Sequence, residues 1–358
     1  MKVIQLLPTL AFGDAVGNDT LALMQVIEEM GYETGIYAET IDERIKNKNV
    51  KLAYKVPYMA PEDILIYHMS IGSQLTYEIE NFNCRKIMIY HNVTPPEFLA
   101  PYNPFTAGAC EEGLKQVKYL SDKFDYCLAD SEFNRQDLIR MGYTCPIDVL
   151  PILIPFDDYK KMPSKRMLRR FDDDFVNILF TGRIAPNKKQ EDVIKCFYYY
   201  KKYFNPKSRL ILAGSYYGME NYYHSLKAFI ERLGAEDVYF TGQIKFNEIL
   251  ACYTAADVFL CMSEHEGFCV PLAEAMAFQI PIVAYDSSAI GWTLGGSGIL
   301  LKDKNPLVAA GMIHQVMTRP GLKEDIVSNE NIRLGDFSHD VIRDQFVQYL
   351  NGFTGERK

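Results

Sequence analysis

Residues 257–276 read DVFLCMSEHEGFCVPLAEAM, which combines an apolar strand, a short loop and the start of a helix. A short apolar run such as 257–262 is typical of a strand buried in a parallel sheet. Pro271 suits the first turn of a helix, where its missing N–H group costs no hydrogen bond. Gly267 lets the backbone approach a ligand closely, so the following amides and the helix dipole can point at an anion. This unit therefore predicts a parallel sheet with an anion-binding loop at the carboxyl end of a strand.

The same alternation of strand-length apolar runs and helical periods continues along almost the whole chain, as in parallel βαβ units. Helices are expected between the strands, for example at 18–30 and 222–233, and a last helix at 338–350. We therefore predict an α/β fold with two Rossmann-like, doubly wound domains that face each other across a cleft. The expected strands are 3–9, 34–38, 64–69, 86–92, 126–130 and 147–153 in the first half, and 176–182, 209–213, 237–241, 257–262 and 281–285 in the second.

A charged stretch without periodicity separates the two halves. Residues 155–174 contain Pro155 and Pro163, six Lys or Arg between Lys160 and Arg170, and then three consecutive aspartates. We expect a domain at 1–155, a linker at 156–174, a second domain at 175–336, and a C-terminal helix at 337–358 that can cross back to the first domain. A cleft between two such sheets is a natural site for ligands with phosphates, because helix N-termini meet there.

Composition and charge exclude several classes of protein. The chain has 358 residues and a net charge of −8, and residues 1–155 carry 13 Lys and Arg against 21 Asp and Glu. An acidic first half argues against nucleic acid as a partner. No run approaches the ~18 consecutive apolar residues of a membrane span, and no secretion signal is evident. The eight cysteines lack a Cys-x2-Cys pair, so we expect a reducing, cytoplasmic location and no structural zinc.

Two glutamates in the segment 257–276 have the chemistry to bind a sugar. Glu266 is expected in the loop before the helix, and Glu274 one turn inside it, facing the same cleft. A carboxylate that accepts two hydrogen bonds suits the vicinal diol of a ribose or a hexose. A solvated acid at a helix start would explain either glutamate alone, but it does not explain the Gly-Phe-x-x-Pro frame around them.

Two cations lie at the end of another predicted strand, in the sequence FTGRIAPNKK at 180–189. Arg183 ends the strand and Lys188 opens the next helix, so both can hold a diphosphate and stabilise it as a leaving group without a metal. Surface lysine and arginine would be the default interpretation, and the position at the mouth of the predicted cleft argues against it.

The Glu266-x7-Glu274 pattern and the Gly-Arg-x4-Lys run at 182–188 together resemble the family-4 retaining glycosyltransferases, which have the GT-B fold. The likeness covers nearly the whole chain. It implies that Glu274 holds the ribose hydroxyls, that Glu266 contacts the donor sugar, and that the two cations bind the diphosphate. It also places the loop residues Gly267, Phe268, Cys269 and Val270 at the donor. Cys269 stands where the family commonly has glycine, although its backbone amide can still serve.

The resemblance extends to strand ends in the first half. Gly13 and Gly17 correspond to the family's glycine loop near the donor phosphate and acceptor, with an ordinary turn as the alternative. His91 resembles the active-site histidine that contacts the donor sugar, and His68, at the end of the neighbouring strand, competes for that role. Ser131 resembles a strand-end serine of the donor site, with helix capping as the alternative.

Two charged segments suggest other interpretations. Asp172–Asp174 resembles a metal-binding run, but it lies in the expected linker, and we interpret it as solvated and predict no metal site. The basic stretch 160–170 can touch anionic lipid, while the acidic first domain limits this to peripheral, transient membrane contact.

We therefore expect a metal-independent, retaining transferase without a cofactor. It would move a hexose from a UDP- or GDP-linked sugar to a glycan or lipid-linked glycan acceptor, in surface polysaccharide or glycoconjugate synthesis. The alternatives are a catalytically inert sugar-nucleotide-binding partner protein and a GT-B-type phosphorylase or epimerase. A dinucleotide oxidoreductase is disfavoured, because no Gly-x-Gly-x-x-Gly follows the first strand of either half. The sugar, the base, the acceptor, the linkage and the oligomeric state are not predicted from the sequence.

Overall fold

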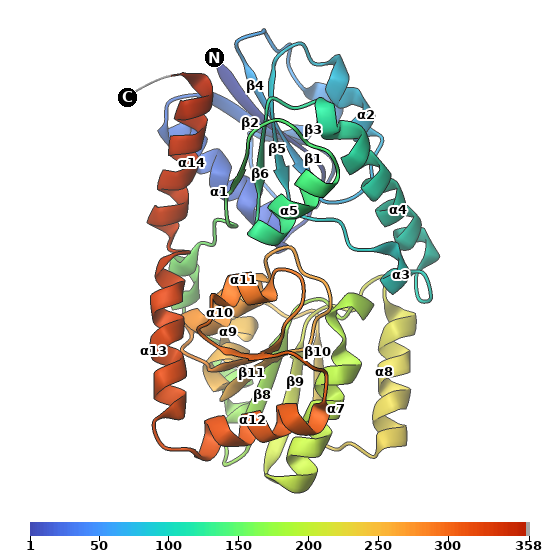
Figure 1. The fold of residues 1–358 in the computed structure, drawn as a ribbon, viewed down its shortest axis with the longest axis vertical. Coiled ribbons are helices and arrows are strands. Elements are labelled where there is room, and N and C mark those ends of the chain that lie inside the picture. The colour runs from blue at the N-terminus through green and yellow to red at the C-terminus, as the bar shows by residue number, and fades with distance from the viewer. Residues whose placement is uncertain (356–358) are drawn as a thin grey trace. The chain divides into compact units, whose positions relative to one another are not determined.

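The computed structural model describes residues 1–355, and this part of the chain divides into two compact units (Figure 1). Unit 1 comprises residues 1–96, 105–155 and the C-terminal segment from Asp336. Unit 2 comprises residues 97–104 and 156–335. Residues 156–174, expected to be a linker, contain the 3-10 helix η4 (Phe156–Lys160) and helix α6 (Lys165–Phe171) and fold within unit 2.

Unit 1 is built on a seven-stranded sheet in which every pair of neighbouring strands is parallel. The strand order is β3-β2-β1-β4-β5-β6-β7, so the order reverses direction between β1 and β4, as in a doubly wound sheet. The strands are β1 (Lys2–Leu10), β2 (Glu33–Ile41), β3 (Val50–Leu52), β4 (Ile64–Met69), β5 (Arg85–Tyr90), β6 (Tyr126–Ala129) and β7 (Ile147–Val149). The helices are α1 (Ala15–Glu29), α2 (Leu75–Glu78), α3 (Pro96–Leu99, mostly in unit 2), α4 (Pro104–Tyr119), α5 (Glu132–Arg140) and α14 (His339–Thr354).

The C-terminal helix α14 belongs to unit 1. Its buried residues Ile342, Phe346 and Leu350 recur every four positions and share one apolar cluster with β1, β4, β5 and β6. In Figure 1 it is the upper red helix, beside α1. The predicted return of this helix to the first half of the chain is therefore confirmed.

Unit 2 contains a six-stranded, all-parallel sheet with the order β10-β9-β8-β11-β12-β13. The order reverses between β8 and β11, so this sheet is also doubly wound, as predicted. The strands are β8 (Val176–Thr181), β9 (Ser208–Ala213), β10 (Val238–Gly242), β11 (Val258–Cys261), β12 (Ile282–Tyr285) and β13 (Ile299–Leu301). The helices are α7 (Gln190–Tyr203), α8 (Glu220–Leu233), α9 (Phe246–Ala255), α10 (Val270–Ala277), α11 (Ile290–Leu294), α12 (Pro306–Thr318) and α13 (Leu322–Gly335).

Within residues 1–355, none of the helices has the length and apolar character needed to cross a membrane.

Glu330 on α13 is a buried carboxyl group whose ionisation opposes folding. Its Oε1 accepts a hydrogen bond from the Ile282 amide (2.9 Å), while its Oε2 has no hydrogen-bond partner among the described residues. Burial raises the pKa of Glu330 to about 8, although the Ile282 hydrogen bond opposes this. Between its unfolded pKa and this value the native state holds a proton that the unfolded state has lost. The free energy of unfolding therefore falls as pH rises through this range.

We expect Glu330→Gln to remove this pH dependence, because a glutamine does not ionise. Near pH 8 the variant should be more stable than the wild type by ~2–4 kcal/mol, and near pH 5 the two should be similar. The chain's only tryptophan, Trp292 on α11, accepts a hydrogen bond at its carbonyl from Arg333 of α13 (2.7 Å). Its fluorescence during urea unfolding therefore reports on this part of unit 2. If the variant and the wild type differed by the same free energy of unfolding at pH 5 and at pH 8, Glu330 would not be the source of the pH dependence.

Candidate functional site

The carboxyl ends of β8 and β11, which are hydrogen-bonded neighbours, bring several predicted residues together in unit 2. The chain after β8 forms the short 3-10 helix η5 (Pro186–Lys188), and the chain after β11 forms the loop that leads into α10. The two loops are linked directly, because the Glu264 amide donates to the Asn187 carbonyl (2.8 Å). The Asn187 side chain in turn donates to the His265 carbonyl (3.1 Å).

Lys188 and Glu266 form a buried ion pair at this junction, in which the Lys188 ammonium donates to Glu266 Oε2. Glu266 is only 7% exposed. Burial disfavours the Lys188 ammonium, but the charge of Glu266 outweighs this effect, and the pKa of Lys188 is raised. The structure therefore places a fixed cation and a fixed carboxylate at the carboxyl end of the sheet, where removing either partner would leave the other charge buried alone.

The loop 267–270 leads from β11 into α10 and is held in place by contacts with α11. Cys269 caps α10 with a φ of 72°, the left-handed region that favours glycine. The Phe268 carbonyl accepts a hydrogen bond from Thr293 Oγ1 (2.5 Å), and its ring meets Trp292 edge-on. The loop is thus anchored from α11, and Val270 begins the helix. Cys269, which stands where the family commonly has glycine, therefore has a backbone conformation that favours glycine.

Glu274 lies inside α10 and has both carboxylate oxygens engaged by tyrosines. The Tyr159 hydroxyl donates to Oε1 and the Tyr253 hydroxyl to Oε2, each at 2.5 Å. The Tyr253 hydroxyl also bonds to Thr181 Oγ1 at the end of β8. Burial raises the pKa of Glu274, and the two tyrosine hydrogen bonds oppose this. Each carboxylate oxygen has two lone pairs, so the tyrosines orient Glu274 and leave it able to accept further hydrogen bonds.

The sequence did not predict these two tyrosines. Tyr159 lies in η4, in the stretch expected to be a linker, and Tyr253 lies in α9 at a spacing that fits an ordinary core position. In the sequence, each of these tyrosines is only an aromatic residue in or near a predicted element, and such residues are common in any protein core.

Arg183 follows β8 but lies next to a different loop from Lys188. A Cβ atom on Gly218 would be 3.6 Å from Arg183 Nη2, and the charge of Arg183 lowers the pKa of Glu220, after larger effects from backbone hydrogen bonds. The backbone carbonyl of Arg183 accepts a hydrogen bond from Gln190 Nε2 (3.1 Å). Arg183 and Lys188 therefore follow β8 in one connection, but Arg183 lies near Gly218 after β9, whereas Lys188 pairs with Glu266 after β11.

Unit 1 holds the remaining predicted residues. Gly13 has a φ of 77°, and the Gly17 amide donates to Asp14 Oδ1 (2.6 Å) in the N-cap of α1. Ser131 caps α5, where its hydroxyl accepts from the Asn134 amide (3.2 Å). The capping alternative for Ser131 is thus observed, and a role at the donor stays a prediction.

The two competing histidines are both buried and are hydrogen-bonded to each other. His68 Nδ1 and His91 Nε2 are 2.9 Å apart, and His91 Nδ1 is 2.9 Å from Asp130 Oδ2. The His91 side chain is 1% exposed, so both of its ring nitrogens are used within unit 1. The two histidines therefore belong to one hydrogen-bonded network.

Residues 164–332 match the family model described as glycosyl transferases group 1. This segment, which makes up most of unit 2, belongs to that family. An uncharacterized glycosyltransferase of Methanocaldococcus jannaschii is 26% identical over 237 residues, which are 64% of this chain but only 56% of that protein. O-antigen chain mannosyltransferase B of Escherichia coli is 26% identical over 322 residues, 81% of each chain.

The crystal structure of Anabaena HepE in complex with UDP and glucose aligns with a TM-score of 0.74 at 17% identity, over 98% of this chain and 100% of that one. The two doubly wound sheets are therefore those of the GT-B fold, as predicted.

Among residues 1–355, two groups of side chains have the composition of metal ligands. Ligand atoms of Cys261, Glu266 and Cys269 lie within 4.8 Å of one another, but the Lys188 ammonium already holds Glu266. The second group comprises Asp19, His68 and His91 in unit 1. The Asp172–Asp174 run is engaged instead in ion pairs, with Asp173 bonded to Arg209 and Asp174 to Lys207.

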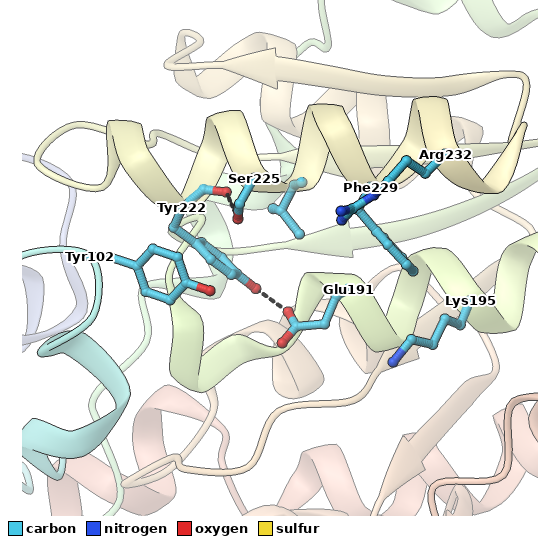
Figure 2. Close-up of a pocket in the computed structure, with 8 residues that line it drawn as sticks. Tyr102, Glu191, Lys195, Tyr222, Ser225, Phe229 and Arg232 are labelled. Atoms are coloured by element: carbon cyan, nitrogen blue, oxygen red, sulfur yellow. Dashed lines mark hydrogen bonds between the residues drawn. The ribbon is translucent and has the colours of Figure 1, made fainter.

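A separate pocket of about 230 Å³ lies between α7 and α8 in unit 2 (Figure 2). Figure 2 shows the Tyr222 hydroxyl pointing to Glu191, with Tyr102 beside the Tyr222 ring. None of the predicted site residues lines this pocket. Its lining consists of Tyr102, Glu191, Lys195, Tyr222, Ser225, Leu226, Phe229 and Arg232.

We expect Tyr253→Phe to weaken donor binding, because Glu274 loses one of the two hydroxyls that orient it. The loss of one hydrogen bond to a charged acceptor should raise KM about tenfold, with a smaller change in kcat. Steady-state kinetics with the donor varied would measure this. A lower KM would instead show that the tyrosine competes with the donor for Glu274.

Proposed function

We propose that this chain transfers a hexose from a nucleoside-diphosphate sugar to a glycan or lipid-linked glycan acceptor, with retention of anomeric configuration. The observation that carries the proposal is the arrangement in unit 2, where the Lys188–Glu266 pair and the oriented Glu274 surround the ends of two adjacent strands. The family supports sugar transfer from a nucleotide sugar. The name of the E. coli relative supports mannose as the sugar, and the UDP complex of HepE supports a uridine nucleotide.

Each residue has a role that follows from its chemistry. The Glu274 carboxylate would accept hydrogen bonds from the two ribose hydroxyls. Arg183 and Lys188 would bind the diphosphate and stabilise the negative charge that grows as it leaves. Lys188 has three N–H donors, so it can hold Glu266 and a phosphate oxygen together. Glu266, held in place by Lys188, would contact the hexose.

Retention follows if the leaving group departs and the acceptor attacks on the same face of the sugar. The phosphate oxygen held by the two cations would then take the proton of the acceptor hydroxyl. We favour this over a covalent intermediate because Glu266 is already paired with Lys188, which lowers its ability to act as a nucleophile.

Thermal-shift measurements against UDP-, GDP-, ADP- and dTDP-sugars test the donor assignment. A donor present at 100 times its Kd should stabilise the protein by about 2.7 kcal/mol. Glu274→Gln should reduce this stabilisation for the same donor, and binding that is unchanged in the variant would contradict the ribose contact. Release of free nucleotide over time then distinguishes an enzyme from an inert sugar-nucleotide-binding protein.

We expect transfer to continue in the presence of EDTA, because the two cations neutralise the leaving diphosphate without a metal. Rates should be measured after dialysis against EDTA, with and without added Mg²⁺ or Mn²⁺. Loss of transfer in EDTA and its recovery with either ion would contradict this mechanism.

A further inference from the structure

Four buried side chains form one hydrogen-bonded line across the sheet of unit 1. Gln5 Oε1 is 2.9 Å from His68 Nε2, His68 Nδ1 is 2.9 Å from His91 Nε2, and His91 Nδ1 is 2.9 Å from Asp130 Oδ2. The four residues belong to β1, to β4 and to the positions just after β5 and β6, which are adjacent in the sheet. The line therefore runs from strand to strand toward the carboxyl end of the sheet.

The direction of each hydrogen bond is fixed from the Gln5 end. The Gln5 amide nitrogen donates to the Thr20 carbonyl (3.0 Å), which leaves the Gln5 oxygen to accept from His68 Nε2–H. Burial, and then the charge of His91, lower the pKa of His68, so this ring is neutral. A neutral ring with its proton on Nε2 can only accept at Nδ1. His91 Nε2 must therefore carry the proton between the two histidines.

The other nitrogen of His91 faces Asp130 Oδ2, which favours a proton on that nitrogen as well. Burial lowers the pKa of His91, but the charge and hydrogen bond of Asp130 and the charges of Asp19 and Asp14 outweigh it, and the pKa is raised. The titratable groups that act on this ring are Asp14 before α1, Asp19 within α1, His68 on β4 and Asp130 after β6. All except His68 are acids. Burial raises the pKa of each acid, that of Asp19 to about 7, but in their ionised form they favour the doubly protonated ring.

A shared proton fits the two histidines better than a metal ion. Ligand atoms of Asp19, His68 and His91 lie within 4.8 Å of one another, which meets the distance requirement for a metal group. However, the two rings are 4° from parallel with centroids 5.2 Å apart and nitrogens 2.9 Å apart. The rings therefore lie edge to edge in nearly one plane, with the two nitrogens aimed at each other. Two metal ligands must instead aim their lone pairs at a common third point.

We propose that His68 is a positioning residue that fixes His91 in one orientation and as a doubly protonated cation. The inference rests on the proposed function and on the family resemblance, which implies that His91 contacts the donor sugar. Because both ring nitrogens are held by protein groups, His91 would act through its positive charge and through the backbone that it anchors. That backbone is unusual, since Asn92 directly after it has a φ of 73°.

Three variants separate this role from simple packing. His68→Leu removes the acceptor for His91 Nε2–H, whereas His68→Asn places an amide oxygen close to the position of Nδ1 and should restore it. Tyr67→Phe is the matched control, because Tyr67 is the adjacent buried residue of β4 and loses one buried hydrogen bond, to Thr76 (2.7 Å), outside the line. Thermal unfolding confirms that each variant is folded.

The first readout is the ring-nitrogen NMR spectrum of ¹⁵N-histidine-labelled protein without donor. The chain has six histidines, and the signals of His68 disappear in its variants, which assigns them. We expect His91 to be doubly protonated near neutral pH in the wild type, in His68→Asn and in Tyr67→Phe. In His68→Leu its pKa should fall by about one unit, because the cation loses a hydrogen-bond acceptor.

The second readout is the pH profile of kcat with the donor identified by thermal shift. We expect the loss of activity at high pH to begin about one pH unit lower in His68→Leu, and at the wild-type position in the asparagine and control variants. A neutral His91 in the wild type, an unchanged titration in His68→Leu, or one equivalent of Zn²⁺ that shifts both ring signals would overturn the proposal. The NMR experiment needs no donor, so its outcome is independent of whether the proposed function holds.

Discussion

Replacing Lys188 with glutamine should lower the rate of sugar transfer by ~10²–10³-fold, because the cation stabilises charge that develops on the leaving diphosphate. Glutamine keeps a hydrogen-bond donor near Glu266, so the buried carboxylate is not left without a partner. Arg183→Ala should have an effect of similar size, from the opposite side of the end of β8. The measurement is the release of nucleoside diphosphate at a saturating concentration of donor.

The neighbouring Lys189 provides the matched control. It carries the same charge, but its ammonium pairs with Glu264 (3.2 Å) instead of Glu266. Lys189→Ala should therefore change transfer only a few fold. If the double variant of Arg183 and Lys188 transferred sugar at nearly the wild-type rate, the assignment of the diphosphate site would be wrong.

The two glutamates of the motif should give opposite kinetic signatures. Glu274→Gln should mainly raise KM, because its contact with the ribose exists in both the ground state and the transition state. Glu266→Gln should mainly lower kcat, by ~10²-fold, because the proposed function places Glu266 at the reacting sugar, and because Glu266 orients the Lys188 cation. Initial rates over a range of donor concentrations separate the two effects. An unchanged kcat in Glu266→Gln would remove Glu266 from the reaction.

The fold was predictable because the two central strands of each sheet are apolar runs of strand length that alternate with helical periods. The segment around β11 and α10 is the clearest case, since burial, glycine and proline all indicate the same strand–loop–helix unit. The edge strands β3 and β13 were not predicted, because each has only three residues. Two of the three residues of β3 are exposed, so no apolar alternation marks it.

The position of a candidate residue was predictable where it depends on the residue's own motif. Glu266 and Lys188 were expected at the same cleft, and the structure pairs them. Partners contributed by distant segments were not predictable: Tyr159 reaches Glu274 from a stretch that reads as a linker. The sequence also could not decide between His68 and His91, because both lie at the ends of neighbouring strands. The structure shows that their side chains are hydrogen-bonded to each other.

Time-resolved ¹H NMR of the wild-type protein with its identified donor measures whether this chain transfers a sugar from a nucleotide donor with retention. The donor's anomeric signal should decay while nucleoside diphosphate appears, and the first sugar product should have the same anomeric configuration as the donor. Early formation of the inverted anomer, or no consumption of any nucleotide sugar that stabilises the protein, would contradict retaining transfer by this chain.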